Sequence, residues 1–210
     1  MSQIVEQLAR QSFPIAAASD FQIQHAKSEL RRLTDEGVLL RLTHGYYVLV
    51  PEAQRGPQTA WRPSIEGIAL GIASAMYDIG TTALVGPSAA RANGCYPRAV
   101  GAGFVAVPKQ RRPRQTPYGN IHFTTRDFAK IDTVRIETDL GQGWATSPEQ
   151  TAFDLVRNYP EWPISGAARS EMLQHLASRI DWSIVDEVAA KTRSVETLER
   201  LRQKLDEDAQ

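Results

Sequence analysis

The sequence predicts an α+β protein, and three observations support this prediction. Residues 23–50 have the pattern of a helix, a glycine stop and two strands in direct succession. Residues 52–63 are rich in proline, glycine and polar side chains, which is typical of a linker. Residues 64–210 then combine helical periodicity with strand-like runs. We therefore expect a small part over residues 1–51, a linker, and a larger part made of a small, mainly antiparallel sheet flanked by helices.

The helix predicted over residues 23–37 rests on the spacing of its apolar side chains. Ile23, Ala26, Leu30 and Leu33 recur at three- and four-residue steps, so they share one face of a helix. Gly37 is a typical stop, because glycine readily adopts the left-handed conformation that ends many helices. The opposite face of this helix is polar and charged.

A hairpin is predicted directly after this helix. Leu40 and Leu42 alternate with polar residues, and His44-Gly45 has the chemistry of a turn. Residues 46–49 are strong strand formers. A helix followed by such a hairpin is the sequence form of the third helix and wing of a winged helix-turn-helix.

Two shorter helices are expected upstream. Ile4, Val5 and Leu8 give a first helix its apolar stripe, and Pro14 then interrupts the pattern. Residues 16–21 are expected to form a short second helix. With these two helices, the winged helix-turn-helix would occupy residues 1–51.

Polar side chains on the predicted third helix and wing point to a nucleic-acid partner. In a winged helix the third helix enters the major groove, where Gln can pair with adenine and Arg with guanine. Wing residues reach phosphates or the minor groove. The predicted DNA contacts are Gln24, His25, Lys27, Ser28, Arg31, Arg32, Arg41 and His44. A plain solvated helix face is the alternative, and winged domains also bind proteins.

The net charge of zero conceals a segregation along the chain. Residues 1–50 carry five basic and five acidic side chains, and this neutrality weakens the case for DNA binding by the winged part alone. Residues 86–135 carry nine basic and two acidic groups, whereas residues 136–210 carry eight basic and fourteen acidic groups. The basic middle suits phosphate contact or an acidic partner, although a solvated hairpin loop is the plainer alternative. Its candidate contacts are Arg91, Arg98, Lys109, Arg111, Arg112 and Arg114.

Residues 64–210 give a readable order of elements. Helices are expected at about 64–78 and 87–93, and strands at 103–107, 119–125 and 133–138, for which an antiparallel arrangement is the simplest. Thr146-Ser-Pro-Glu149 is a strong helix start, and that helix should run to Asn158. Three further helices are expected at about 167–179, 183–192 and 195–207.

The sequence offers little for catalysis. The four histidines show no metal-ligand spacing, and the single Cys95 permits no internal disulfide and no zinc cluster. Asp154 is the best candidate for a catalytic acid, but a carboxylate in an apolar helix more often caps or pairs. We therefore expect no enzyme, no cofactor and no metal, with a nuclease-like activity as a remote alternative. No signal peptide or membrane span is found, so a cytoplasmic location is expected.

Three segments of the chain share the pattern of one family. Residues 33–48 (LTDEGVLLRLTHGYYV) run from a helix into a wing that ends in Gly-x-Tyr. Residues 86–94 (GPSAARANG) form a Ser-Ala helix closed by glycine, and in residues 145–156 (ATSPEQTAFDLV) Ser-Pro-Glu leads into an apolar helix with an aspartate. In order and spacing, over about residues 3–160, the chain resembles the AbiEi-type antitoxins of bacterial abortive-infection toxin–antitoxin pairs.

The resemblance implies a protein with two functions. Its winged helix would bind inverted repeats in the double-stranded promoter of its own operon and repress it. Its C-terminal domain would neutralise a nucleotidyltransferase-like toxin, directly or indirectly. Two alternatives stay open, a promoter-binding regulator without a toxin and a winged-helix module that binds a protein.

Overall fold

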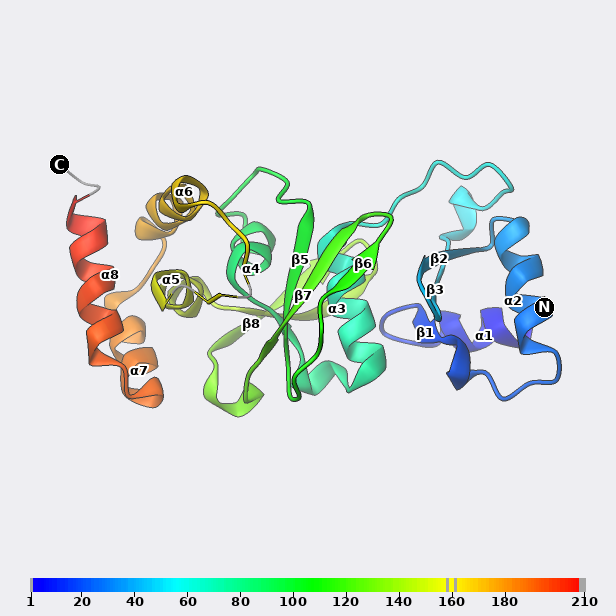
Figure 1. The fold of residues 1–210 in the computed structure, drawn as a ribbon, viewed down its shortest axis with the longest axis horizontal. Coiled ribbons are helices and arrows are strands. Elements are labelled where there is room, and N and C mark those ends of the chain that lie inside the picture. The colour runs from blue at the N-terminus through cyan, green and yellow to red at the C-terminus, as the bar shows by residue number, and fades with distance from the viewer. Residues whose placement is uncertain (1, 158, 161, 208–210) are drawn as a thin grey trace.

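The molecule is elongated, with its N-terminal part at one end of the long axis and its last helices at the other (Figure 1). This computed structural model describes residues 2–157, 159–160 and 162–207. A six-stranded sheet lies between the two ends, with helices on both of its faces.

The helices and strands of the N-terminal part are compatible with a helix that is followed by a wing. Its elements are α1 (Gln3–Ala9), β1 (Ile15–Ala17), the 3-10 helix η1 (Ala18–Asp20), α2 (Ala26–Asp35), β2 (Leu39–Thr43) and β3 (Tyr46–Leu49). The three strands form an antiparallel sheet in the order β1-β3-β2, in which β2 and β3 are the wing. The predicted third helix and hairpin are therefore present as α2 and the wing.

Two expectations for this part differ from the structure. The helix expected over residues 16–21 is reduced to the 3-10 helix η1, because residues 15–17 pair with the wing as a strand: Ile15 lies opposite Val48, and the Ala18 amide donates to the Gly45 carbonyl at 2.7 Å. The next helix begins at Ala26, later than expected. His25 stands immediately before it with a φ of 63°, a left-handed conformation that helix residues do not adopt.

The second part is built on a mixed sheet. Its strands are β4 (Ala83–Leu84), β5 (Ala102–Val107), β6 (Arg114–Thr116), β7 (Gly119–Thr125), β8 (Thr133–Thr138) and β9 (Gly141–Thr146), in the order β6-β7-β5-β4-β9-β8. Three of the five pairings are antiparallel, in agreement with the expected antiparallel-rich sheet. Every residue of β5 is buried, as befits a central strand covered on both faces.

Two strand pairs, β4–β9 and β5–β7, are parallel and so differ from the simplest expectation. β5 and β7 are parallel along their whole length, from Ala102 opposite Asn120 to Val107 opposite Thr125. The cause is β6, which forms a tight hairpin with β7 on its outer side. The chain must therefore return along the sheet before β7 starts, and the segment 108–113 that precedes β6 carries Lys109, Arg111 and Arg112.

Helices cover both faces of the six-stranded sheet. They are α3 (Ile65–Met76), α4 (Gly86–Ala92), α5 (Pro148–Arg157), α6 (Gly166–Ala177), α7 (Trp182–Thr192) and α8 (Val195–Glu207). Alternate residues of β5 face opposite sides: Val105 and Val107 pack with α3, whereas Phe104 and Ala106 belong to the core formed with the helices from α4 to α8. No helix within the described residues is both long and apolar enough to cross a membrane.

The core beneath α3 is shared with the N-terminal part. Ile15 and Val48 of the three-stranded sheet belong to the same buried cluster as Ile68 and Ile72 of α3. Gly71 permits this close approach, because a Cβ there would lie 2.5 Å from Ile15 Cδ1. The small sheet is thus packed onto α3.

The connection between α2 and the rest of the chain depends on a glycine. Gly37 has a φ of +66°, and its carbonyl accepts a hydrogen bond from the Gly56 amide at 3.3 Å. A Cβ at Gly37 would collide with the Gly56 carbonyl. The expected helix stop is confirmed, and it also makes room for the segment that follows the wing.

Candidate nucleic-acid interface

The exposed face of α2 and the turn before it carry six of the eight residues predicted to contact DNA. Leu30 and Leu33 turn inward and are 2% and 3% exposed. The residues on the outer side and in the turn before the helix lie at the surface, and they are Gln24, His25, Lys27, Ser28, Arg31 and Arg32. The Ser28 hydroxyl donates to the His25 carbonyl at 2.8 Å, so the turn before the helix is tied to its first residues.

The charges on this face are not equally available. The Arg32 guanidinium binds two carboxylates, Glu29 at 2.8 Å and Glu36 at 2.6 Å. Arg31 has only a long, solvent-exposed contact of 3.9 Å with Asp35. Lys27 has no ion pair among the described residues. Because Arg32 is already neutralised, Lys27 and Arg31 are the cations of α2 best able to meet a phosphate or a base.

The ion pair with Arg32 makes the Glu29 carboxyl more acidic. Hydrogen bonds from Arg32 and then from Ser2 lower the pKa of Glu29 from 4.5 to about 2. The carboxylate therefore stays ionised over the whole neutral range.

The tip of the wing holds a second pair of predicted contacts. Arg41 Nη2 lies 3.2 Å from His44 Nδ1, and Arg41 Nε donates to the Thr43 carbonyl at 3.4 Å. The strand register shifts between Arg41 and Thr43, which bends the wing there. The two basic side chains therefore lie together at the same end of the hairpin.

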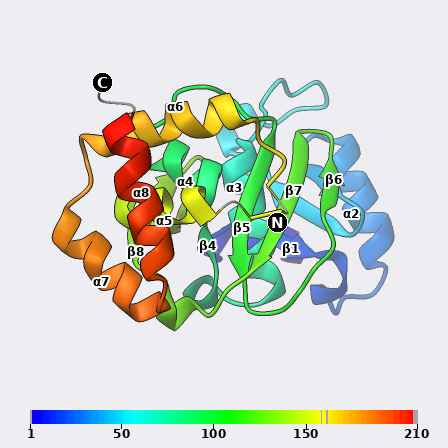
Figure 2. The same ribbon diagram turned by 60° about the vertical axis from the view of Figure 1, so that its left-hand side comes forward.

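The arginine-rich segment before β7 lies against this wing. Arg114 Nη1 donates to the His44 carbonyl at 3.3 Å, although 70 residues separate the two in sequence, and the Arg114 guanidinium lies 4.9 Å from the ring centroid of Tyr46. The Thr43 hydroxyl donates to the Gln115 carbonyl at 2.9 Å. Figure 2 shows β6 at the edge of the large sheet that faces the N-terminal part.

Two more arginines extend this basic surface. Arg111 Nε donates to the Tyr77 hydroxyl at 2.6 Å, and its guanidinium lies 5.4 Å from the centroid of that ring. Arg112 is exposed and has no hydrogen-bond or ion-pair partner among the described residues. Lys109 lies nearby, where its carbonyl accepts from the Tyr77 hydroxyl at 3.3 Å. We call the set Arg41, His44, Arg111, Arg112 and Arg114 the basic rim.

The other two candidate phosphate contacts lie elsewhere and are engaged by acids. Arg91 Nε binds Glu66 at 2.6 Å, and Arg91 Nη1 donates to the carbonyl of Pro97 at 3.2 Å. Arg98 binds Glu171 at 3.3 Å. Arg91 thus ties α4 to α3, and Arg98 ties the following loop to α6. The structure brings the wing and residues 111–114 together but leaves these two arginines out.

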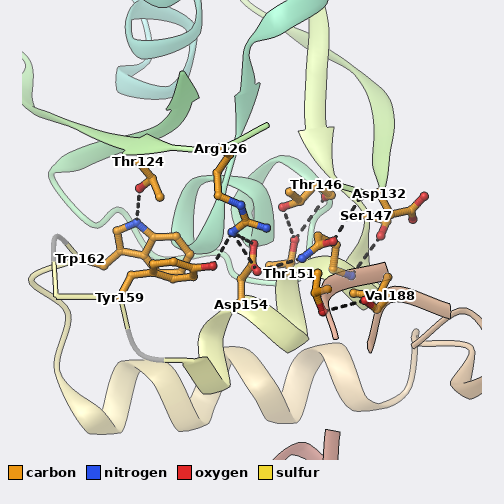
Figure 3. Close-up of polar contacts among 12 residues, drawn as sticks. Thr124, Arg126, Asp132, Thr146, Ser147, Thr151, Asp154, Tyr159, Trp162 and Val188 are labelled. Carbon is orange, nitrogen blue, oxygen red and sulfur yellow. Dashed lines mark hydrogen bonds and ion pairs between the residues drawn. The ribbon is translucent and has the colours of Figure 1, made fainter. Parts of the chain in front are cut away.

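A buried polar network holds the far end of β7 in place (Figure 3). Arg126, directly after β7, donates through Nη1 to both oxygens of Asp154 at 3.1 Å and to the Tyr159 hydroxyl at 2.6 Å. Gln150 Nε2 adds a bond of 2.9 Å to Asp154, and Trp162 Nε1 donates to Thr124 at 2.9 Å. This network ties the sheet to α5 and to the segment after it.

The residues considered for catalysis are enclosed. Asp154 is fully buried, and burial raises the pKa of its carboxyl against the opposing charge of Arg126. Burial likewise raises the pKa of the Cys95 thiol, which favours its unreactive protonated form. Within the part of the chain that the structure describes, no three His, Cys, Asp or Glu side chains are grouped to hold a metal ion. The Asp154 carboxylate therefore acts as a structural counter-ion.

Sequence reasoning missed the side chains that position the basic rim. Tyr46 and Tyr77 hold Arg114 and Arg111, and Thr43 fixes the hairpin of β6 to the wing. Tyr46 belongs to the Gly-x-Tyr of the wing, and its place in that pattern indicates only a strand former. Nothing in the sequence signals the pairing of Tyr77 with Arg111, which is 34 residues away.

Comparisons with known proteins agree with this architecture. A family model described as the AbiEi antitoxin C-terminal domain matches residues 82–207. A crystal structure of the RV2827C protein from Mycobacterium tuberculosis is similar, with a TM-score of 0.61 and 17% sequence identity, over 97% of this chain and 75% of that one. At this identity the similarity concerns the fold alone. No significant match was found among curated proteins.

Proposed function

Because this chain belongs to the AbiEi antitoxin family, we propose that it is the antitoxin of a toxin–antitoxin pair that also represses its own operon. Residues 1–51 are the DNA-binding part in this proposal, residues 52–63 the connection, and residues 64–210 the antitoxin part. Its partners are double-stranded promoter DNA with inverted repeats and a nucleotidyltransferase-like toxin, both in the cytoplasm.

The single observation that carries the DNA-binding proposal is the contact between the wing and the arginines before β7. The winged part alone is electrically neutral, and a neutral surface gains little affinity from phosphates. The bond from Arg114 to the His44 carbonyl holds Arg114 beside the wing, and Arg111 and Arg112 border the same depression as Thr43 of the wing. The basic rim therefore supports a model in which α2 contacts the bases and the rim contacts the phosphate backbone of the DNA.

The chemistry of α2 suits the major groove. Gln24, Ser28 and Arg31 lie at the surface and offer the donors and acceptors that base edges require. Lys27, which is exposed and has no ion pair among the described residues, is the phosphate contact of α2 in this proposal. Arg32 is expected to contribute less, because Glu29 and Glu36 already occupy its guanidinium.

An electrophoretic shift of the chain's own promoter tests this proposal. Gln24→Ala and Arg31→Ala should each relax sequence preference, because removing one direct hydrogen-bonding partner of a base costs roughly 1–3 kcal/mol. Lys191→Ala is the control, since this exposed lysine lies on α7 at the opposite end of the molecule. Failure of the wild type to shift the promoter at low salt would refute DNA binding.

The antitoxin role needs a separate test. Membership in the family implies a toxin partner. Co-expression with the product of the adjacent reading frame should rescue growth, and residues 64–210 should be required for that rescue. A neighbouring frame that encodes no toxin would instead favour a promoter-binding regulator.

A further inference from the structure

Beside the basic rim the surface sinks into a hollow of about 740 Å³. Its walls come from the wing, the end of α3, residues 111–115 and β7. They include Thr43, Arg111, Arg112, Arg114, Asn120 and His122. The volume falls within the roughly 300–1,000 Å³ of small-molecule sites. We call this depression the arginine hollow.

The hollow exists because β6 is short. β6 pairs with β7 only from Gly119 to Ile121, and before Arg114 the chain swings away toward Tyr77. The Thr125 hydroxyl, at the other end of β7, donates to the Gln110 side chain at 2.8 Å and holds the start of this segment. The segment is therefore held at Gln110 and at Arg114, and β6 pairs with β7 only from Arg114 onward.

The charge of the hollow is uncompensated. Among the described residues that line it, three are arginines and none is acidic. None of the three arginines has a carboxylate partner in the described chain, whereas Arg32, Arg91 and Arg126 elsewhere all do. Three unneutralised guanidiniums around one depression attract an anion, and their planar forks suit phosphate oxygens.

The other residues that line the hollow suit a ligand larger than a simple anion. Asn120 presents an exposed amide, and the His122 ring is stacked on Phe104 with centroids 5.2 Å apart, which fixes its plane. Met76 and Phe123 supply apolar surface. Guanidiniums combined with an amide and some apolar surface match a phosphate joined to a planar heterocycle.

We infer that the arginine hollow is a binding site for a small phosphate-bearing molecule of nucleotide size, which competes with DNA for the arginines of the rim. The regulatory part of this inference rests on the proposed DNA binding, whereas occupancy of the hollow does not. If binding is mutually exclusive, a ligand at ten times its own Kd raises the apparent Kd for DNA about elevenfold.

Calorimetric titration of the full chain tests the site with two probes, ATP and inorganic triphosphate. Arg112→Ala should weaken both probes at least tenfold, and folding should be unaffected because this side chain is exposed and unpartnered among the described residues. Asn120→Ala should weaken ATP but leave triphosphate unchanged. Lys191→Ala, which removes the same charge far away, should bind both as the wild type does.

Each result bears on one part of the inference. Absence of binding by both probes at millimolar concentration overturns the site, even if promoter DNA is still shifted. Equal weakening by Arg112→Ala and Lys191→Ala overturns its location. If ATP binds but saturating ATP leaves the Kd for promoter DNA unchanged, the competition is overturned. Binding of ATP by a chain that shifts no DNA supports the site and refutes the proposed DNA binding alone.

Discussion

Removal of the three arginines beside the wing should change how DNA binding responds to salt. The triple variant Arg111→Ala, Arg112→Ala, Arg114→Ala deletes three cations that have no carboxylate partner in the described chain. Each phosphate neutralised contributes about 0.9 to the slope of log K against log salt, so the slope should become shallower by up to about 2.7. Between 50 and 200 mM salt, the wild type should then lose roughly fortyfold more affinity than the variant.

Fluorescence anisotropy with a labelled promoter duplex, repeated at four or five salt concentrations, measures this slope. The control Arg200→Ala, Arg202→Ala, Lys204→Ala also removes three positive charges, but from the exposed surface of α8 at the far end of the molecule. Its slope should equal that of the wild type. An unchanged slope for the rim variant would refute the reasoning, as would equal slopes for both triple variants.

Three further predictions concern the framework of the site. Asp154→Asn should cost about 3–5 kcal/mol in the free energy of unfolding, measured by urea denaturation, because it leaves the buried Arg126 charge unpaired. Gly37→Ala should cost at least about 1–2 kcal/mol in the same assay, since alanine resists a φ of +66°. Glu29 should titrate near 2 by NMR, so the stability that its ionisation contributes is present above its unfolded pKa and lost as pH falls toward 2, and Arg32→Ala should raise its pKa toward the ordinary range, with the Ser2 hydrogen bond still lowering it.

Matched controls make these outcomes decisive. Glu196→Gln breaks an exposed ion pair with Arg200 and should cost under about 1 kcal/mol. If Asp154→Asn costs no more than that, Asp154 is not the counter-ion of Arg126. Gly45→Ala provides the comparison for Gly37, because it has a φ of +79° with open space around it. An equal cost at both positions would show that the clash with the Gly56 carbonyl adds nothing.

Local patterns predicted the elements that depend on local physics. The periodicity of Leu30 and Leu33 predicted α2, and the His44-Gly45 turn predicted the wing. Residues 15–17 could not be predicted in the same way, because a three-residue strand is stabilised by its partner β3 and not by its own sequence. The same holds for β4, with two residues, and β6, with three.

The residues of the candidate site could be predicted, but their arrangement in space could not. The sequence identified both α2 and the arginine-rich segment. The contact between Arg114 and His44 joins residues that lie 70 positions apart, and no local sequence pattern indicates it. One local signal does distinguish the arginines of α2: Glu29 and Glu36 lie three residues before and four after Arg32, the spacing at which helix side chains meet. Arg31 has such a neighbour on one side only, Asp35, so the number of acidic neighbours distinguishes Arg32 from Arg31.

The packing of the small sheet onto α3 affects how the protein unfolds and how a protease would act on it. Because Ile15 and Val48 share one core with Ile68 and Ile72, the winged part has no complete core of its own for that face. A fragment cut after residue 51 would expose these side chains, and loss of α3 would loosen the wing. A separate core that includes Ile4, Leu8, Leu30 and Leu39 remains within this part, so we expect the exposed face of the small sheet to loosen first, and under the proposed function a protease that destroys the antitoxin part would also weaken promoter binding.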